Sequence, residues 1–275
     1  WDDPDLGDAG DDFVGCDTTL SLGYCYNDGA DSDYGYEAPA IGYDFFQAAV
    51  PGAMTDTTFA FGESQVGFQN LPMSSFTKYI NGDWVYADPY NAQEAYNYMS
   101  GFLRDGTPFI DSETGLPSRF VHPCDPNENT GQGDDCWVDS DNHASGDRRF
   151  LMNVGPFNFE SGDSLELVFG MMHAQGDNSL SSVTLLKQVD QLAQLAYDIQ
   201  FSLPEPPPQP NLIVTSTNTS IVNEWNDVAE GYTVIDPIYL DEFGYPTIYQ
   251  FEGYNLWQFE NIDGSGEKYK LATFD

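Results

Sequence analysis

The first 77 residues carry fourteen aspartate and glutamate side chains and neither lysine nor arginine, and Lys78 is the first cation of the chain. Over the whole chain 45 acidic side chains stand against 8 basic ones, which gives a formal net charge of -37. Two carboxylates about 4 Å apart repel each other by about 1 kcal/mol in water, and by more where they are partly buried. A compact fold therefore calls for bound divalent cations or a salty medium that screens the charge, unless the charge serves only solubility.

This charge balance excludes several classes of function. Binding to nucleic-acid phosphates or to anionic lipid needs clustered cations, which the sequence does not contain. No stretch approaches the roughly 18 apolar residues of a membrane span. Hydrophobic residues nevertheless make up 40% of the chain, enough for a real core. We expect a folded protein without a nucleic-acid partner and without membrane insertion.

The four cysteines form two local pairs, Cys16 with Cys25 and Cys124 with Cys136. Neither pair has the C-x-x-C spacing of zinc or redox sites. The spacing favours two local disulfides, each contributing roughly 3 kcal/mol by the loop-entropy estimate. Four reduced, buried thiols are the alternative. Disulfides imply an oxidising compartment, so we expect an extracellular or cell-surface location. The chain starts at Trp1 without a signal peptide, as a mature or proteolysed piece of a longer secreted protein would.

The proline-rich stretch 204–210 is the clearest boundary in the chain and predicts a stiff, extended linker. It separates an acidic, disulfide-containing domain (1–203) from a shorter segment (211–275). The first domain is predicted to be a mainly β, sandwich-type domain with two helices. Its expected strands are 41–50, 57–61, 76–80 and a stretch ending near 174, and residues 1–35 read as loop.

Helix signals occur twice in the first domain. Asn91 and Glu94 have the spacing of a capping box, which predicts a helix over 92–104 that stops at Gly106. Ser181 or Ser182 is expected to cap a second helix that runs to about residue 200. Its apolar stripe is expected to comprise four residues, with Leu186 and Ala193 beside them: Leu185, Val189, Leu192 and Ala196.

The segment from Pro210 onward resembles the first half of a fibronectin type III domain. The resemblance rests on the proline that opens the first strand, on Trp225 at the end of the second, and on Tyr254 in the third. It implies that Trp225 packs near Tyr254 in a sandwich core. The segment departs from the family by an acidic, tyrosine-rich insertion over 226–246, and the final strands are absent. The resemblance therefore implies an incomplete sandwich.

The larger part of the chain is similar to a segment found in large bacterial multidomain surface proteins of the kind exported by type IX secretion. The similar stretches are 3–8, 24–27, 39–47, 146–152 and 155–157. This resemblance implies no reaction. Its motifs are typical of turns, core strands and acidic loops.

Calcium is the expected cofactor, because it takes six to eight oxygen ligands from acidic loops. Three segments offer such oxygens. The first contains Asp3, Asp5, Asp8, Asp11 and Asp12; the second contains Asn27, Asp28, Asp31 and Asp33; the third contains Asp134, Asp135, Asp139, Asp141 and Asp147. None matches the D-x-[DN]-x-[DN]-G loop, so each segment could equally be a solvated acidic loop.

Catalytic signals are weak. His122, His143 and His173 show no zinc-binding spacing, and a shared site would require the fold to bring them together. The stretch 62–67 is one residue too long for the G-x-S-x-G elbow. Paired carboxylates for glycoside hydrolysis are always available among 45 acids and carry no information. No catalytic residue is assigned.

Aromatic side chains allow a carbohydrate-binding function. Six tyrosines could form a sugar-stacking surface or fill the core: Tyr34, Tyr36, Tyr86, Tyr90, Tyr96 and Tyr98.

The sequence as a whole favours a non-enzymatic structural or adhesive module of a large extracellular bacterial protein, stabilised by calcium. Its partners would be other modules of the same parent chain, glycans, surface proteins or further copies in a filament. A carbohydrate-binding module of a secreted degradative protein is the first alternative. A hydrolase without a recognisable motif is the second.

Overall fold

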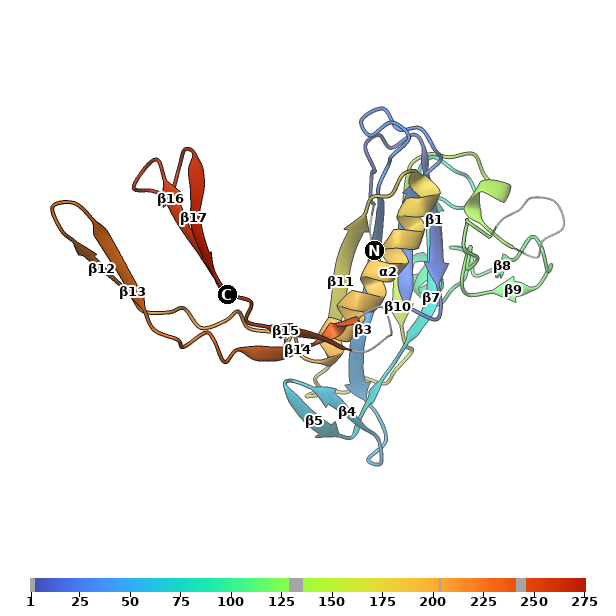
Figure 1. Cartoon of the computed structure of the whole chain (residues 1–275). Coiled ribbons are helices and arrows are strands. Elements are labelled where there is room, and N and C mark those ends of the chain that lie inside the picture. The colour runs from blue at the N-terminus through green and yellow to red at the C-terminus, as the bar shows by residue number, and fades with distance from the viewer. Residues whose placement is uncertain (1–2, 129–135, 203, 241–245) are drawn as a thin grey trace. The chain divides into compact units, whose positions relative to one another are not determined.

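The computed structural model describes residues 3–128, 136–202, 204–240 and 246–275. The chain divides into two compact units, Trp1–Tyr197 (unit 1) and Asp198–Asp275 (unit 2). Strands predominate and two α-helices are present, so the expected mainly β class is confirmed (Figure 1). Among the described residues, no helix combines the length and the apolar character needed to cross a bilayer.

The main sheet of unit 1 is antiparallel and has the strand order β1-β2-β3-β11, with β6 paired to one end of β3. The bounds of these strands are β1 Asp12–Asp17, β2 Leu22–Asn27, β3 Ala40–Pro51, β6 Phe68–Asn70 and β11 Glu166–Ala174. A second antiparallel sheet pairs β7 (Met73–Ile80) with β10 (Arg148–Val154). Unit 1 also contains two short antiparallel strand pairs and one 3-10 turn. The pairs are β4 Thr57–Ala60 with β5 Glu63–Val66 and β8 Phe109–Ile110 with β9 Pro117–Ser118, and the turn is η1 Asp139–Asp141.

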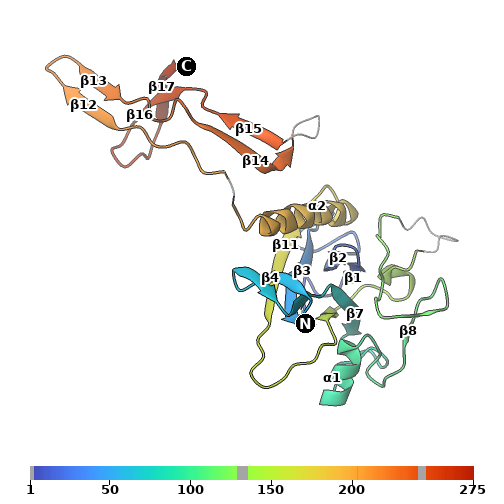
Figure 2. The same cartoon turned by 90° about the horizontal axis from the view of Figure 1, so that it is seen from below.

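Two apolar layers bury both faces of the main sheet at β1 and β2. On one face Val14, Cys16 and Cys25 pack with Phe76 of β7 and Phe150 of β10. On the other face Phe13, Leu22 and Tyr24 pack with Val183 and Leu186 of α2 (Ser179–Asp198). Figure 2 shows the resulting layers, with α2 on one side of the main sheet and β7 on the other. This double burial makes unit 1 a packed sandwich with a helical cover.

The expectation of loop over residues 1–35 is wrong for β1 and β2, which are the most deeply buried strands of unit 1. All six residues of β2 are buried. Because both faces of these strands are covered, the sequence does not alternate between apolar and polar residues, and the usual strand pattern is absent.

Helix α1 (Ala92–Met99) begins as expected and ends early. The Glu94 amide donates to Asn91 Oδ1 at 3.0 Å, and the Glu94 carboxylate accepts from the Tyr90 amide at 2.8 Å. The helix ends because Gly101 adopts φ +80°, which lets the Phe102 amide donate back to the Asn97 carbonyl at 2.9 Å. Gly101, and not Gly106, is the stop signal.

Helix α2 is capped by Asn178, whose Oδ1 accepts from the Ser181 amide at 2.9 Å, so neither Ser181 nor Ser182 is the cap. Its buried face differs from the expected stripe. Val183, Leu186 and Asp190 are buried, whereas Leu185 and Leu192 are exposed. Gly42 permits the close approach of the helix, since a Cβ there would lie 3.0 Å from Leu186 Cδ2.

One of the two expected disulfides is present. Cys124 and Cys136 are bonded, with their Cα atoms 5.4 Å apart. Cys16 and Cys25 are buried free thiols, which corrects the expectation of a bridge between them. The β1–β2 register explains this, because Cys16 pairs with Gly23 and Cys25 pairs with Val14. The two cysteines are therefore diagonal neighbours, farther apart than the directly opposed positions of the ladder.

Unit 2 consists of three antiparallel hairpins that are not hydrogen-bonded into one sheet among its described residues. The hairpins pair β12 Leu212–Ser216 with β13 Ile221–Trp225, β14 Thr233–Leu240 with β15 Pro246–Gln250, and β16 Tyr254–Phe259 with β17 Lys268–Phe274. Trp225 lies 5.5 Å from Tyr254 and 5.1 Å from Phe274 between ring centroids. The stretch expected as an insertion thus contributes β14 and forms a hairpin with β15.

Candidate metal centre

Asp8, Asp11 and Asp31 form the best candidate for a metal site. One carboxylate oxygen from each residue lies within 4.8 Å of the other two. Oxygens that bind calcium lie about 2.3–2.6 Å from the ion, so two ligands of one ion can be up to about 5 Å apart. The group joins the first expected segment to the second. Among the described residues, no single expected segment forms such a group alone.

Asp31 is held rigidly by backbone amides. Its Oδ1 accepts from Asp33 and Tyr34 at 2.6 Å each, and its Oδ2 accepts from Asp8 at 3.2 Å. These hydrogen bonds lower the pKa of Asp31 although burial opposes them, so its carboxylate is charged at neutral pH. Gly7 is required here, because a Cβ at this position would lie 2.2 Å from Asp31 Oδ2.

Asp11 supplies an observation that is independent of the clustering. Its side chain is 9% exposed, and its Oδ1 has no hydrogen-bond partner among the described residues. Burial, followed by the charges of Asp8 and Asp31, raises the pKa of Asp11. A buried carboxylate oxygen without a partner is costly, and a bound cation would satisfy it.

Asp3, Asp5 and Asp147 form a second group of three, which joins the first expected segment to the third. Arg149 already neutralises part of this group. Its Nε lies 2.9 Å from Asp3 Oδ2 and 3.7 Å from Asp147 Oδ1. This group is therefore the weaker candidate for a cation.

The remaining expected ligands lie outside both groups. Asp12 is the first residue of β1 and is fully buried, and burial raises its pKa to about 7. Asp28 accepts from Ser145 Oγ at 2.6 Å, and Asp33 is exposed. Asp141 lies in η1. Asp134 and Asp135 lie outside the described residues.

Asp139 has a role that the calcium interpretation missed. It is fully buried, and its Oδ2 accepts from Arg148 Nε at 2.9 Å and from the Val14 amide at 3.1 Å. Its Oδ1 pairs with the buried Lys78 ammonium. These partners, with Lys78 first, hold the pKa of Asp139 well below its usual range despite burial. Asp139 is thus an internal counter-ion rather than a free metal ligand.

Two of the three histidines meet at this counter-ion. His122 Nε2 and His143 Nδ1 lie 3.6 Å and 3.9 Å from Asp139 Oδ1. Burial, together with Lys78, lowers the pKa of His122 well below its usual value, so the ring is neutral. Lys78 and Arg148 already neutralise the carboxylate between the rings. His173 is exposed on β11, and the metal-competent groups among the described residues contain no histidine or cysteine.

The sequence-based expectations also missed a pair of buried aspartates. Asp44 of β3 and Asp190 of α2 are both 1% exposed. Burial is the main cause that raises the pKa of Asp44 to about 8 and that of Asp190 to about 7. The sequence contains one signal for this pair, because Asp190 falls on the apolar face of a helix, where an aspartate is unusual. The sequence alone does not identify Asp44 as its neighbour, because Asp44 lies 146 residues away.

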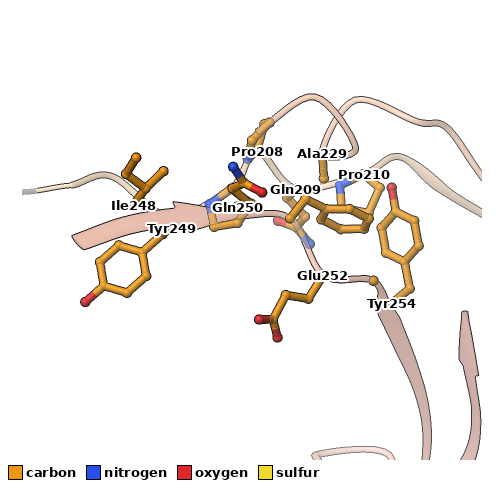
Figure 3. Close-up of a pocket in the computed structure, with 12 residues that line it drawn as sticks. Pro208, Gln209, Pro210, Ala229, Ile248, Tyr249, Gln250, Glu252 and Tyr254 are labelled. Atoms are coloured by element: carbon orange, nitrogen blue, oxygen red, sulfur yellow. The ribbon is translucent and has the colours of Figure 1, made fainter. Parts of the chain in front are cut away.

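The expected tyrosine surface divides between core and solvent. Tyr98 is buried and Tyr86 packs against the same core, whereas Tyr36 and Tyr90 are strongly exposed. Unit 2 has an open groove of about 630 Å³, lined by the proline stretch and by aromatic residues of β15 and β16. Figure 3 shows Tyr254 beside Pro210, whereas the Glu252 carboxylate points away from both.

Comparisons of the chain with protein-family models, with curated proteins and with solved structures find no match.

Proposed function

We propose that this chain is an extracellular structural or adhesive module that is stabilised by calcium. The observation that carries the proposal is the group of Asp8, Asp11 and Asp31, in which the rigid, charged Asp31 carboxylate lies near a buried Asp11 oxygen that has no hydrogen-bond partner. Calcium would tie the amino-terminal loop to the loop after β2. Other modules of the same parent chain are the proposed partners.

The Cys124–Cys136 disulfide supports the location outside the cell, because disulfides persist in oxidising compartments. The net charge of -37 favours a medium that contains salt and divalent cations. Three carboxylates completed by water suit the weak binding of extracellular calcium modules, with a dissociation constant of about 10⁻⁴–10⁻³ M.

Calorimetric titration with calcium, together with melting at constant ionic strength, tests this proposal. We expect calcium to raise the melting temperature more than magnesium does, and the variant Asp11→Asn to weaken calcium binding about tenfold, because it removes one of the three charged ligands. Asp33→Asn is the matched control, since Asp33 is a neighbouring exposed aspartate outside the group. Equal calcium responses of the two variants, or no calcium response in the unmodified protein, would overturn the proposal.

A further inference from the structure

A groove of about 440 Å³ in unit 1 lies between the carboxyl end of α1, the segment through Arg119 and the turn that follows β10. Its volume is in the range of sites for small molecules. Six side chains give it a mixed aromatic and polar lining: Tyr96, Met99, Phe102, Arg119, Asn153 and Phe157.

Arg119 is the cation that lines this groove, and among the described residues it forms no ion pair. The other cations of unit 1 are engaged: Lys78 and Arg148 with Asp139, Arg149 with Asp3 and Asp88, Lys187 with Asp17 and Asp125, and Arg104 with the Trp84 carbonyl. Among the described residues, no carboxylate and no hydrogen-bond acceptor meets the Arg119 guanidinium. This leaves a solvent-exposed cation in the lining of the groove without a counter-charge.

The backbone and the base of the Arg119 side chain are held in place. Its carbonyl accepts from the Phe76 amide at 3.0 Å, which fixes the backbone against β7. Gly101 packs directly on its stem, since a Cβ there would lie 2.8 Å from Arg119 Cβ. The guanidinium lies over the Phe102 ring, 5.8 Å from the centroid. A side chain whose base is fixed before binding loses less entropy when a ligand arrives.

The lining of the groove offers further hydrogen-bonding groups. Asn153 Nδ2 donates to Ser75 Oγ at 3.0 Å, and Ser75 Oγ donates to the Met99 carbonyl at 3.0 Å. The first of these bonds fixes the Asn153 amide. Asn153 Oδ1 and Ser100 Oγ form no hydrogen bond among the described residues, and both residues line the groove. An acceptor and a hydroxyl in these positions suit the hydroxyl groups of a ligand.

We propose that this groove binds a carboxylated sugar, such as a hexuronate unit of an acidic polysaccharide. The guanidinium fork matches a carboxylate with two parallel hydrogen bonds. Tyr96, which is 57% exposed, offers a ring face for the apolar side of the sugar, and Asn153 Oδ1 accepts from a hydroxyl. The inference is independent of the proposed calcium site, which involves none of these residues.

Calorimetry and ligand-observed NMR with trigalacturonate test this inference, with its methyl ester as the neutral counterpart and calcium held constant. We expect trigalacturonate to bind and the ester to bind about tenfold more weakly, because the ester cannot form the charge-assisted pair. Arg119→Gln should lower the affinity for trigalacturonate by about tenfold or more for the same reason. Tyr96→Ala should lower it by a smaller factor.

Arg104→Gln is the matched control, since it removes the same charge from unit 1 at a residue that does not line the groove. It should leave the affinity unchanged. Absence of trigalacturonate binding, equal binding of the ester, or equal effects of the two arginine variants would overturn the inference. Binding of a carboxyl-terminal tripeptide in place of the sugar would overturn it as well and would identify a peptide ligand.

Discussion

Asp139 illustrates how single residues solve the charge problem inside unit 1. Two cations, Lys78 and Arg148, are buried with it, and they come from the adjacent strands β7 and β10. Burial is the main cause that lowers the pKa of Lys78 to about 8, whereas Asp139 opposes that shift. The two cations remain tolerable in the core only as long as the carboxylate stands between them.

Replacement of this carboxylate should therefore be severe. We expect Asp139→Asn to lower the free energy of unfolding by about 3–5 kcal/mol, because it leaves two buried cations without a counter-charge. Urea denaturation measures the loss, and Asp177→Asn, at an exposed aspartate, is the control. A loss within about 1 kcal/mol of the control, the range of exposed ion pairs, would contradict the role assigned to Asp139.

Helix α2 is the element whose attachment depends on pH. Asp190 on its buried face lies against Asp44 of β3, and the carboxylate of Asp17 adds to the rise in the pKa of Asp190. Lys187 Nζ on the same helix lies 3.1 Å from Asp17 Oδ2. The folded protein holds the protons of Asp44 and Asp190 up to about pH 8 and 7, whereas the unfolded chain releases them near pH 4. Stability from this pair is therefore fully present below about pH 4 and is lost as the pH rises toward 8.

Asp190→Asn should reduce this dependence, since residue 190 no longer ionises and its amide can donate to the Asp44 carboxylate. We expect the variant and the unmodified protein to melt at similar temperatures near pH 5. At pH 8.5 the variant should be more stable by about 1–3 kcal/mol, given that one pKa unit corresponds to about 1.4 kcal/mol. Thermal melts across this range measure the difference, with Asp177→Asn as the control. A difference that does not grow with pH would refute the pair as its cause.

The elements also show what the sequence could reveal. The capping box at Asn91 and Glu94 is local, and α1 begins where it predicts. The apolar and β-branched residues of β3 and β7 predict these two strands. The stripe of α2 was displaced by one residue, because pattern alone favours Leu185 over Leu186 and cannot find a partner for Asp190.

The candidate metal site also combines a local feature that the sequence shows with a long-range contact that it does not show. Composition indicated acidic loops correctly, but the group of Asp8, Asp11 and Asp31 forms only when β1 and β2 pair and bring the two loops together. The same pairing separates Cys16 from Cys25. Register is set by packing on both faces of the sheet, and a single sequence does not contain that information in a readable form.

The net charge of -37 acts on the molecule as a whole. Monovalent salt screens repulsion between exposed carboxylates, and the Debye length falls from about 30 Å at 0.01 M to about 3 Å at 1 M. We therefore expect the melting temperature to rise steadily with sodium chloride over this range. Calorimetry with the calcium concentration held constant measures the effect. A melting temperature that is insensitive to salt would mean that the repulsion is already relieved by pairing within the fold.

Strand β11 lies at the outer side of the main sheet and turns Leu167, Phe169 and Met171 toward solvent. An exposed, apolar edge strand can pair with the same strand of another copy and so lead to aggregation. Repulsion between strongly negative copies opposes this aggregation. The same net charge that destabilises each folded molecule therefore keeps the molecules apart in solution. This protection vanishes as the carboxylates become neutral near the isoelectric point of about 4.1, where the chains would gather into precipitate.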